Sequence, residues 1–233
     1  ITMKASTVTR SILFIFFLGT SIITIGQEPL SVQDLLSLKF CSSIKMSPDG
    51  ENIIYTAGTP RTANEEAGGS HLVHYKMNLK GRTSDVIFND SIKASRPTWS
   101  PDGKSVSFLY KVKDGKKQVW MMPLDGDEMK QLTNSQTDIM EYQLSPNGKS
   151  IAFRTKKSIS DRQKELNERG YGFIFYEENI RNAELFIANI IEGKLEDLRQ
   201  IKLDGHVTGF HFSEDSKQIL AGVCPQNLVD HKY

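Results

Sequence analysis

The segment TWSPDGKSVSFLY, residues 98–110, contains a turn sequence between two strand-like runs. In SPDG, the serine opens the turn and the proline fixes φ at the next position. The aspartate can hydrogen-bond its own backbone, and the glycine accepts the left-handed conformation. After the turn, Val106 and Phe108 alternate with polar residues, which is typical of a strand with one apolar face. The segment therefore predicts a β-hairpin.

Similar turns occur at four places in the chain, and the fourth copy, SEDS, is degenerate. Their serines are 53, 45 and 68 residues apart. The predicted turn residues are Ser47, Pro48, Asp49 and Gly50; Ser100, Pro101, Asp102 and Gly103; Ser145, Pro146, Asn147 and Gly148; and Ser213 and Asp215.

The residues around the four turns form matching apolar columns. The column just before the serine consists of Met46, Trp99, Leu144 and Phe212. The two columns after the turn consist of Ile53, Val106, Ile151 and Ile219, and of Tyr55, Phe108, Phe153 and Ala221. Further strand–turn–strand patterns follow at 74–88, 118–133 and, with a longer turn, 183–201. Four strands per unit at this period predict a partial β-propeller, an all-β fold of antiparallel blades.

The predicted blades lie near residues 40–91, 92–136, 137–205 and 206–233. The third contains an insertion at 156–182, in which Ser160 and Gln163 form a plausible capping box ahead of a short surface helix. The fourth has only its first two strands, so we expect about three complete blades and a truncated fourth. This organisation describes a fragment that carries about half of a propeller.

The composition and the first residues bear on the compartment. A formal net charge of +1 gives no general attraction to nucleic acid. Lys4 and Arg10 precede an uncharged apolar run at 11–26, which predicts a signal peptide over 1–26 and a propeller domain over 27–233. The run is short for a membrane span, so we expect export to the periplasm or medium; an uncleaved anchor is the alternative.

For the two cysteines we expect separate buried thiols, with one long-range disulfide as the alternative.

Three stretches carry a family resemblance. The opening EPLSVQDLLSLKFCSSIKMSPDG (28–50), the block at 96–134 and YEENIRNAELFI (176–187) resemble the prolyl oligopeptidase family of serine peptidases. They are most similar to its acylaminoacyl-peptidase and dipeptidyl-peptidase branch. The resemblance implies a propeller followed by an α/β-hydrolase domain with a Ser-Asp-His triad. No G-x-S-x-G nucleophile elbow occurs in this sequence, so we expect no catalytic residue in these 233 residues.

The resemblance also implies a substrate-binding pair, Glu177 and Glu178. Paired glutamates on a propeller insertion bind the free α-amino group of substrates in dipeptidyl-peptidase relatives, which carboxylates do through charge-assisted hydrogen bonds. The alternative is a surface pair facing Arg181. We expect no cofactor and no metal, since no acidic residue is spaced to complete a site with His71 and His74.

Two function classes remain open. The first is the substrate-gating propeller of an exported serine peptidase that hydrolyses short peptides. In that case the propeller would act on peptide substrates together with a hydrolase domain. The second is a non-catalytic propeller of the cell envelope that binds proteins, similar to Tol-system propellers. The oligomeric state is open in both.

Overall fold

A computed structural model describes residues 29–125, 128–173 and 180–228. The chain divides into two compact units, residues 1–37 and 38–233. In the first unit, helix α2 (Val32–Ser37) begins after Ser31, whose hydroxyl oxygen accepts a hydrogen bond from the backbone N–H of Asp34 (3.1 Å). The Asp34 carboxylate accepts one in return from the backbone N–H of Ser31 (2.8 Å). This reciprocal pair is a capping box, which fixes the start of a helix too short to be stable by propensity.

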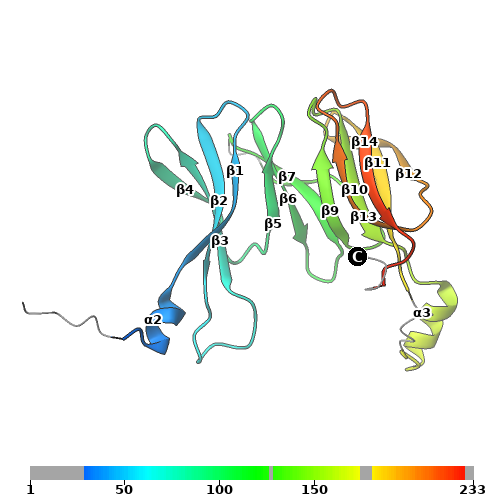
Figure 1. The fold of residues 1–233 in the computed structure, drawn as a ribbon, viewed down its shortest axis with the longest axis horizontal. Coiled ribbons are helices and arrows are strands. Elements are labelled where there is room, and N and C mark those ends of the chain that lie inside the picture. The colour runs from blue at the N-terminus through cyan, green and yellow to red at the C-terminus, as the bar shows by residue number, and fades with distance from the viewer. Residues whose placement is uncertain (1–28, 126–127, 174–179, 229–233) are drawn as a thin grey trace, which may run out of the picture. The chain divides into compact units, whose positions relative to one another are not determined.

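The second unit consists of antiparallel sheets whose strands are hydrogen-bonded in chain order (Figure 1). Blade 1 contains β1 (Phe40–Met46), β2 (Asn52–Thr59), β3 (His71–Asn78) and β4 (Thr83–Phe88). Blade 2 contains β5 (Ser95–Trp99), β6 (Ser105–Lys111), β7 (Lys117–Pro123) and β8 (Lys130–Gln131). Blade 3 contains β9 (Ile139–Leu144), β10 (Ser150–Lys156), β11 (Ala183–Ile191) and β12 (Lys194–Ile201). Blade 4 contains β13 (His206–Phe212) and β14 (Ile219–Cys224). The predicted fold class, a partial propeller with three four-stranded blades and a shorter fourth, is confirmed.

The four turns share one hydrogen-bond pattern. In blade 2, the backbone N–H of Ser100 donates to the carbonyl of Ser105 (2.8 Å), and its side-chain oxygen accepts from the backbone N–H of Ser105 (2.9 Å). Asp102 accepts from the backbone N–H of Lys104 (3.0 Å) and from the Ser100 hydroxyl, which together hold the pKa of its carboxyl below its usual range. Gly103 has a φ of 72°, so a side chain here would be strained. The same bonds recur around Ser47, Ser145 and Ser213.

The turns also lie against one another from blade to blade. A Cβ added to Gly103 would lie 3.6 Å from Pro48, and one added to Gly148 would lie 3.8 Å from Pro101. The backbone N–H of Asn147 donates to the hydroxyl oxygen of Ser216 in the last turn (3.0 Å). The repeated turns thus form a row that fixes how neighbouring blades are aligned.

Three apolar clusters fill the spaces between consecutive blades. The first joins blades 1 and 2 and includes Ile54, Phe88, Trp99, Val106 and Phe108. The second joins blades 2 and 3 and includes Leu109, Val119, Leu144, Ile151 and Phe153. The third joins blades 3 and 4 and includes Ala152, Leu185, Val207 and Phe212. Blades 2 and 3 therefore bury both faces on their neighbours, and blades 1 and 4 bury one face each, as neighbouring propeller blades do.

Two details of the columns and cysteines differ from expectation. Trp99, Leu144 and Phe212 are buried. Met46 in the same column is 64% exposed, because no other described sheet packs on that face of blade 1. Both cysteines are free thiols, and only Cys224 is buried; Cys41 is exposed on the same strand as Met46. The expectation of two buried thiols is therefore wrong for Cys41.

The insertion contains helix α3 (Asp161–Glu168), as predicted. Ser160 is its N-cap and accepts from the backbone N–H of Gln163 (3.2 Å). The Gln163 side chain, however, donates to Asn167 (3.0 Å) instead of returning to Ser160, so only half of the predicted capping box forms. The predicted longer turn between β11 and β12 is also wrong. Glu192 and Gly193, with φ of 50° and 74°, make a two-residue hairpin turn.

Candidate functional site

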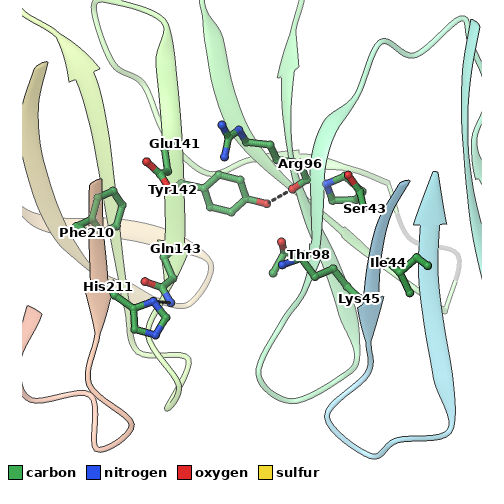
Figure 2. Close-up of a pocket in the computed structure, with 11 residues that line it drawn as sticks. Ser43, Ile44, Lys45, Arg96, Thr98, Glu141, Tyr142, Gln143, Phe210 and His211 are labelled. Carbon is green, nitrogen blue, oxygen red and sulfur yellow. Dashed lines mark hydrogen bonds between the residues drawn. The ribbon is translucent and has the colours of Figure 1, made fainter. Parts of the chain in front are cut away.

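A polar pocket of about 540 Å³ lies among the first strands of all four blades (Figure 2). β1, β5, β9 and β13 are the first strands of their sheets, and in a propeller such strands surround the central axis. The lining residues are Ser43, Ile44, Lys45, Arg96, Pro97, Thr98, Glu141, Tyr142, Gln143, Phe210 and His211. The volume falls within the range typical of sites for small ligands.

The lining follows the sequence repeat. Blades 1, 2 and 3 each contribute the residues two, three and four positions before the turn serine, as Arg96, Pro97 and Thr98 do before Ser100. Blade 4 contributes two of these positions, Phe210 and His211. The next position is the apolar column represented by Trp99, which is buried between blades. The short segment of β5 therefore has two roles: its last residue, Trp99, packs between blades, and the residues before it line the axial pocket.

A β-bulge in every first strand shapes this surface. The register shifts between Ser42 and Lys45 in β1 and between Ser95 and Thr98 in β5. In β9 and β13 it shifts slightly earlier in the strand, between Ile139 and Glu141 and between Val207 and Gly209. Two of the bulges place a residue other than glycine in the left-handed region, Ser43 (φ 54°) and Arg96 (φ 55°). A bulge bends the strand and redirects its side chains, which is why bulges are common beside binding sites.

Tyr142 forms the floor between the two sides of the pocket. Its hydroxyl donates to the carbonyl oxygen of Arg96 (3.1 Å) and lies 3.0 Å from Oγ of Ser107 (Figure 2). Burial raises the pKa of the Tyr142 hydroxyl above its usual value, so the group stays protonated as a donor. The bond connects blade 3 to the bulge of blade 2 and holds the Arg96 backbone in its unusual conformation.

The charged groups of the pocket are not balanced. The Glu141 carboxylate accepts from Nε of Arg154 (2.8 Å), whose Nη1 donates to the carbonyl of Val207 (2.8 Å). Among the residues that the structure describes, Lys45 and Arg96 form no ion pair. Because Glu141 is already neutralised by Arg154, the pocket presents a net positive charge.

Gln143 and His211 close the pocket on the side of blade 4. The Gln143 amide oxygen accepts from the backbone N–H of Phe212 (3.1 Å), which fixes the orientation of the amide. Its nitrogen then lies 3.2 Å from Nδ1 of His211, which accepts the hydrogen bond. The far side of the pocket is thus a fixed polar wall.

The turn residues singled out from the sequence do not line the pocket. Glu177 and Glu178 fall outside the described residues. Arg181, their alternative partner, donates through Nε to the carbonyl of Lys157 (2.7 Å). The turn residues around Ser100 have the structural arrangement given above and do not line the pocket. Sequence reasoning missed the pocket residues, because no shared residue type marks their positions before the turn serines.

His71 and His74 do not act together. His74 is buried, with Nδ1 2.8 Å from the Thr56 hydroxyl and Nε2 2.9 Å from the Ala94 carbonyl. His71 instead lies between Asp90 (2.6 Å) and Glu65 (2.5 Å). Sequence spacing did not indicate these two carboxylates: the loop before β3 brings Glu65 to His71 and the loop after β4 brings Asp90, while His74 has neither as a partner.

The cluster around His71 predicts a pH dependence of local stability. Hydrogen bonds to Asp90 and Glu65 raise the pKa of His71 above its ordinary value of 6.5, against smaller opposing effects of desolvation and of the positive charge of Arg61. The stabilisation is fully present below that value and is lost as the pH rises through the raised pKa. His71 lowers the pKa values of both carboxyls, so their contribution is lost as the pH falls through those lowered values.

We expect Asp90→Asn to lower the pKa of His71, since it removes the largest cause of the shift. Titration of the His71 ring protons by NMR measures this, and the parent chain serves as the reference. An unchanged His71 titration in the variant would contradict the arrangement.

Known proteins resemble this chain in sequence and in fold. No family model matches the chain. Two curated relatives match by sequence: a dipeptidyl-peptidase 5 from Porphyromonas endodontalis, 23% identical over 133 residues, and the uncharacterized peptidase YuxL from Bacillus subtilis, 24% identical over 141 residues. The matches cover 57% and 58% of this chain but 19% and 21% of the relatives. The chain thus spans about a fifth of their length.

Solved structures share the fold. An acylaminoacyl peptidase aligns over 82% of this chain and 29% of its own, with a TM-score of 0.57 and 15% identity. The chain is similar to the propeller portion of prolyl oligopeptidase-family peptidases. This resemblance, expected from the sequence, is confirmed by the two curated relatives. TolB from Acinetobacter baumannii aligns over 78% of this chain and 37% of its own, with a TM-score of 0.51 and 21% identity, so this chain also resembles TolB in fold.

Within the described ranges, no helix is both long and apolar enough to cross a bilayer.

Proposed function

We propose that residues 38–228 belong to the substrate-gating propeller of an exported serine peptidase that hydrolyses short peptides. The observation that carries this proposal is that both curated sequence relatives are named as peptidases. Catalysis would reside in a hydrolase domain that accompanies the propeller, because the sequence itself contains no nucleophile elbow. Export rests on the signal-like residues 1–26.

The pocket supports this role by its place and size. It lies where four first strands approach the axis, so a peptide passing along the axis would meet its polar wall. A space of about 540 Å³ suits a short extended peptide and excludes a folded domain. Glu177 and Glu178 remain the proposed residues for a free α-amino group of such a substrate.

A second candidate function is a non-catalytic platform of the cell envelope. The fold similarity to TolB, with a TM-score of 0.51, favours it. In that case the same axial pocket would bind a segment of a partner protein, and no hydrolase domain would accompany the propeller.

Capture of the native protein separates the two functions. Antibodies raised against the 233-residue chain would isolate the protein from cells that produce it, and a fluorophosphonate probe would then label any activated serine. We expect stoichiometric labelling of one serine in the native protein, because nucleophile, base and oxyanion hole act together. The recombinant 233-residue chain is the control and should stay unlabelled. A captured native protein that is folded but unlabelled would overturn the peptidase proposal in favour of the platform.

A further inference from the structure

Two cations face the axial pocket, and neither has an acidic partner within residues 29–125, 128–173 and 180–228. Lys45 and Arg96 come from adjacent blades, and both side chains are solvent-exposed within the lining. Figure 2 shows Arg96 extending above the ring of Tyr142, while Lys45 lies on the other side of it, near Thr98. A group that enters between the blades would therefore meet positive charge on both sides of the tyrosine.

The one acidic side chain of the lining does not cancel this charge. Glu141 is held by Arg154, and both side chains are mostly buried, with exposed fractions of 29% and 15%. A buried, hydrogen-bonded pair is electrostatically satisfied and leaves little negative potential for other cations. An incoming carboxylate would thus find Arg96 and Lys45 free to bind it.

Arg96 occupies a position that its backbone disfavours. It has a φ of 55°, in the left-handed region that residues with a Cβ disfavour. The next residue is Pro97, which further restricts the residue before it. Glycine or asparagine would fit this conformation with less strain. The strain is understandable if the bulge serves to direct a guanidinium, and guanidinium binds carboxylates with two parallel hydrogen bonds.

We propose that the axial pocket binds the carboxylate of a peptide through Arg96, with Lys45 adding to the attraction. The inference rests on the proposed peptide-handling function and specifies its substrate class as anionic peptides. The carboxylate can belong to the C-terminus or to an Asp or Glu side chain, since both present the same planar anion. Thr98, Gln143 and His211 supply the polar wall for the peptide backbone.

Four blocked peptides test the proposal by isothermal titration calorimetry against the full 233-residue chain. Acetyl-Gly-Phe-Gly-Ala is compared with its C-terminal amide, and acetyl-Gly-Glu-Gly-Ala-amide with the corresponding Gln peptide. We expect each anionic member to bind about tenfold tighter than its neutral partner, a difference of about 1.4 kcal/mol. Raising NaCl to about 0.5 M should reduce the difference, because the pocket is open to solvent.

Matched variants assign the effect to residues. Arg96→Asn removes the guanidinium and suits a left-handed φ, so the fold should be kept while the anionic preference disappears. Lys45→Gln should reduce that preference. Arg82→Asn is the control, since Arg82 also has a left-handed φ (52°) but lies in the outer hairpin of blade 1, away from the pocket. It should bind like the parent chain.

The outcomes separate the inference from the function beneath it. A preference for only one of the two anionic peptides supports the proposal and identifies the source of the carboxylate. Equal binding of anionic and neutral peptides, or an anionic preference that survives Arg96→Asn, overturns the inference and leaves the peptidase function standing. Failure of all four peptides to bind overturns the inference, and the fluorophosphonate experiment then decides whether the peptidase function falls with it.

Discussion

Replacement of Phe108 by alanine is expected to unfold much of the interface between blades 1 and 2. The Phe108 side chain is 0% exposed, and its ring centroid lies 4.3 Å from that of Phe88 across the interface. Truncation of a buried phenylalanine costs about 3–5 kcal/mol through lost burial and the cavity left behind. Whole domains are stable by only about 5–15 kcal/mol, so this loss should shift the urea midpoint strongly.

Tryptophan fluorescence is a suitable measurement for Phe108→Ala. Trp99 and Trp120 both pack in the same cluster, so their emission reports on this interface. Leu220→Ala is the control: Leu220 is 79% exposed, and its truncation should change stability by less than about 0.5 kcal/mol. An unchanged midpoint in Phe108→Ala would show that the blades do not depend on this contact.

The second large effect is expected at a turn serine, Ser145. Its side chain is 0% exposed. Its hydroxyl oxygen accepts a hydrogen bond from the backbone N–H of Ser150 (2.9 Å), and the hydroxyl donates one to Oδ1 of Asn147 (2.8 Å). Ser145→Ala leaves the N–H of Ser150 without its partner in a site from which water is largely excluded. An unsatisfied buried donor costs about 1–3 kcal/mol.

A matched variant exists in the same repeat. Ser213 accepts from the backbone N–H of Gln218 (3.0 Å) and bonds Asp215 (2.6 Å), but its turn is more open to solvent. Water can replace the lost hydroxyl there, so Ser213→Ala should cost less than about 1 kcal/mol. Urea denaturation of the two variants gives the comparison. Equal losses would mean that burial does not set the importance of the turn serine.

The blades were predictable because their signals are local. Turn residues such as Asp102 and Gly103 determine backbone conformation within a few residues, and alternation determines which side chains share a face. Errors arose where the outcome depends on distant neighbours. Met46 is apolar like the other residues of its column, yet it is exposed, because its burial would require a second sheet packed on that face of blade 1.

The pocket could not be predicted in the same way. Its columns combine Ser43, Arg96 and Glu141 at one position of the repeat, so no shared residue type marks them. Whether these side chains meet in one pocket depends on the relative placement of four sheets and on bulges that shift the register by one residue. The pair Glu177 and Glu178, taken from a family resemblance, lies outside the described residues and stays a prediction.

The bulged first strands have a consequence for redesign. Ser43–Lys45 and Arg96–Thr98 both begin with a left-handed residue, and the strand that contains each segment ends at a blade turn. The alignment of the blades depends on the turns, whereas the two tripeptides share no residue type. Moving the arginine to the equivalent position of the neighbouring blade would therefore leave the contacts between the turns in place. Recognition in such a propeller can therefore diverge by shuffling short segments among blades, independently of the constraints that keep the sheets together.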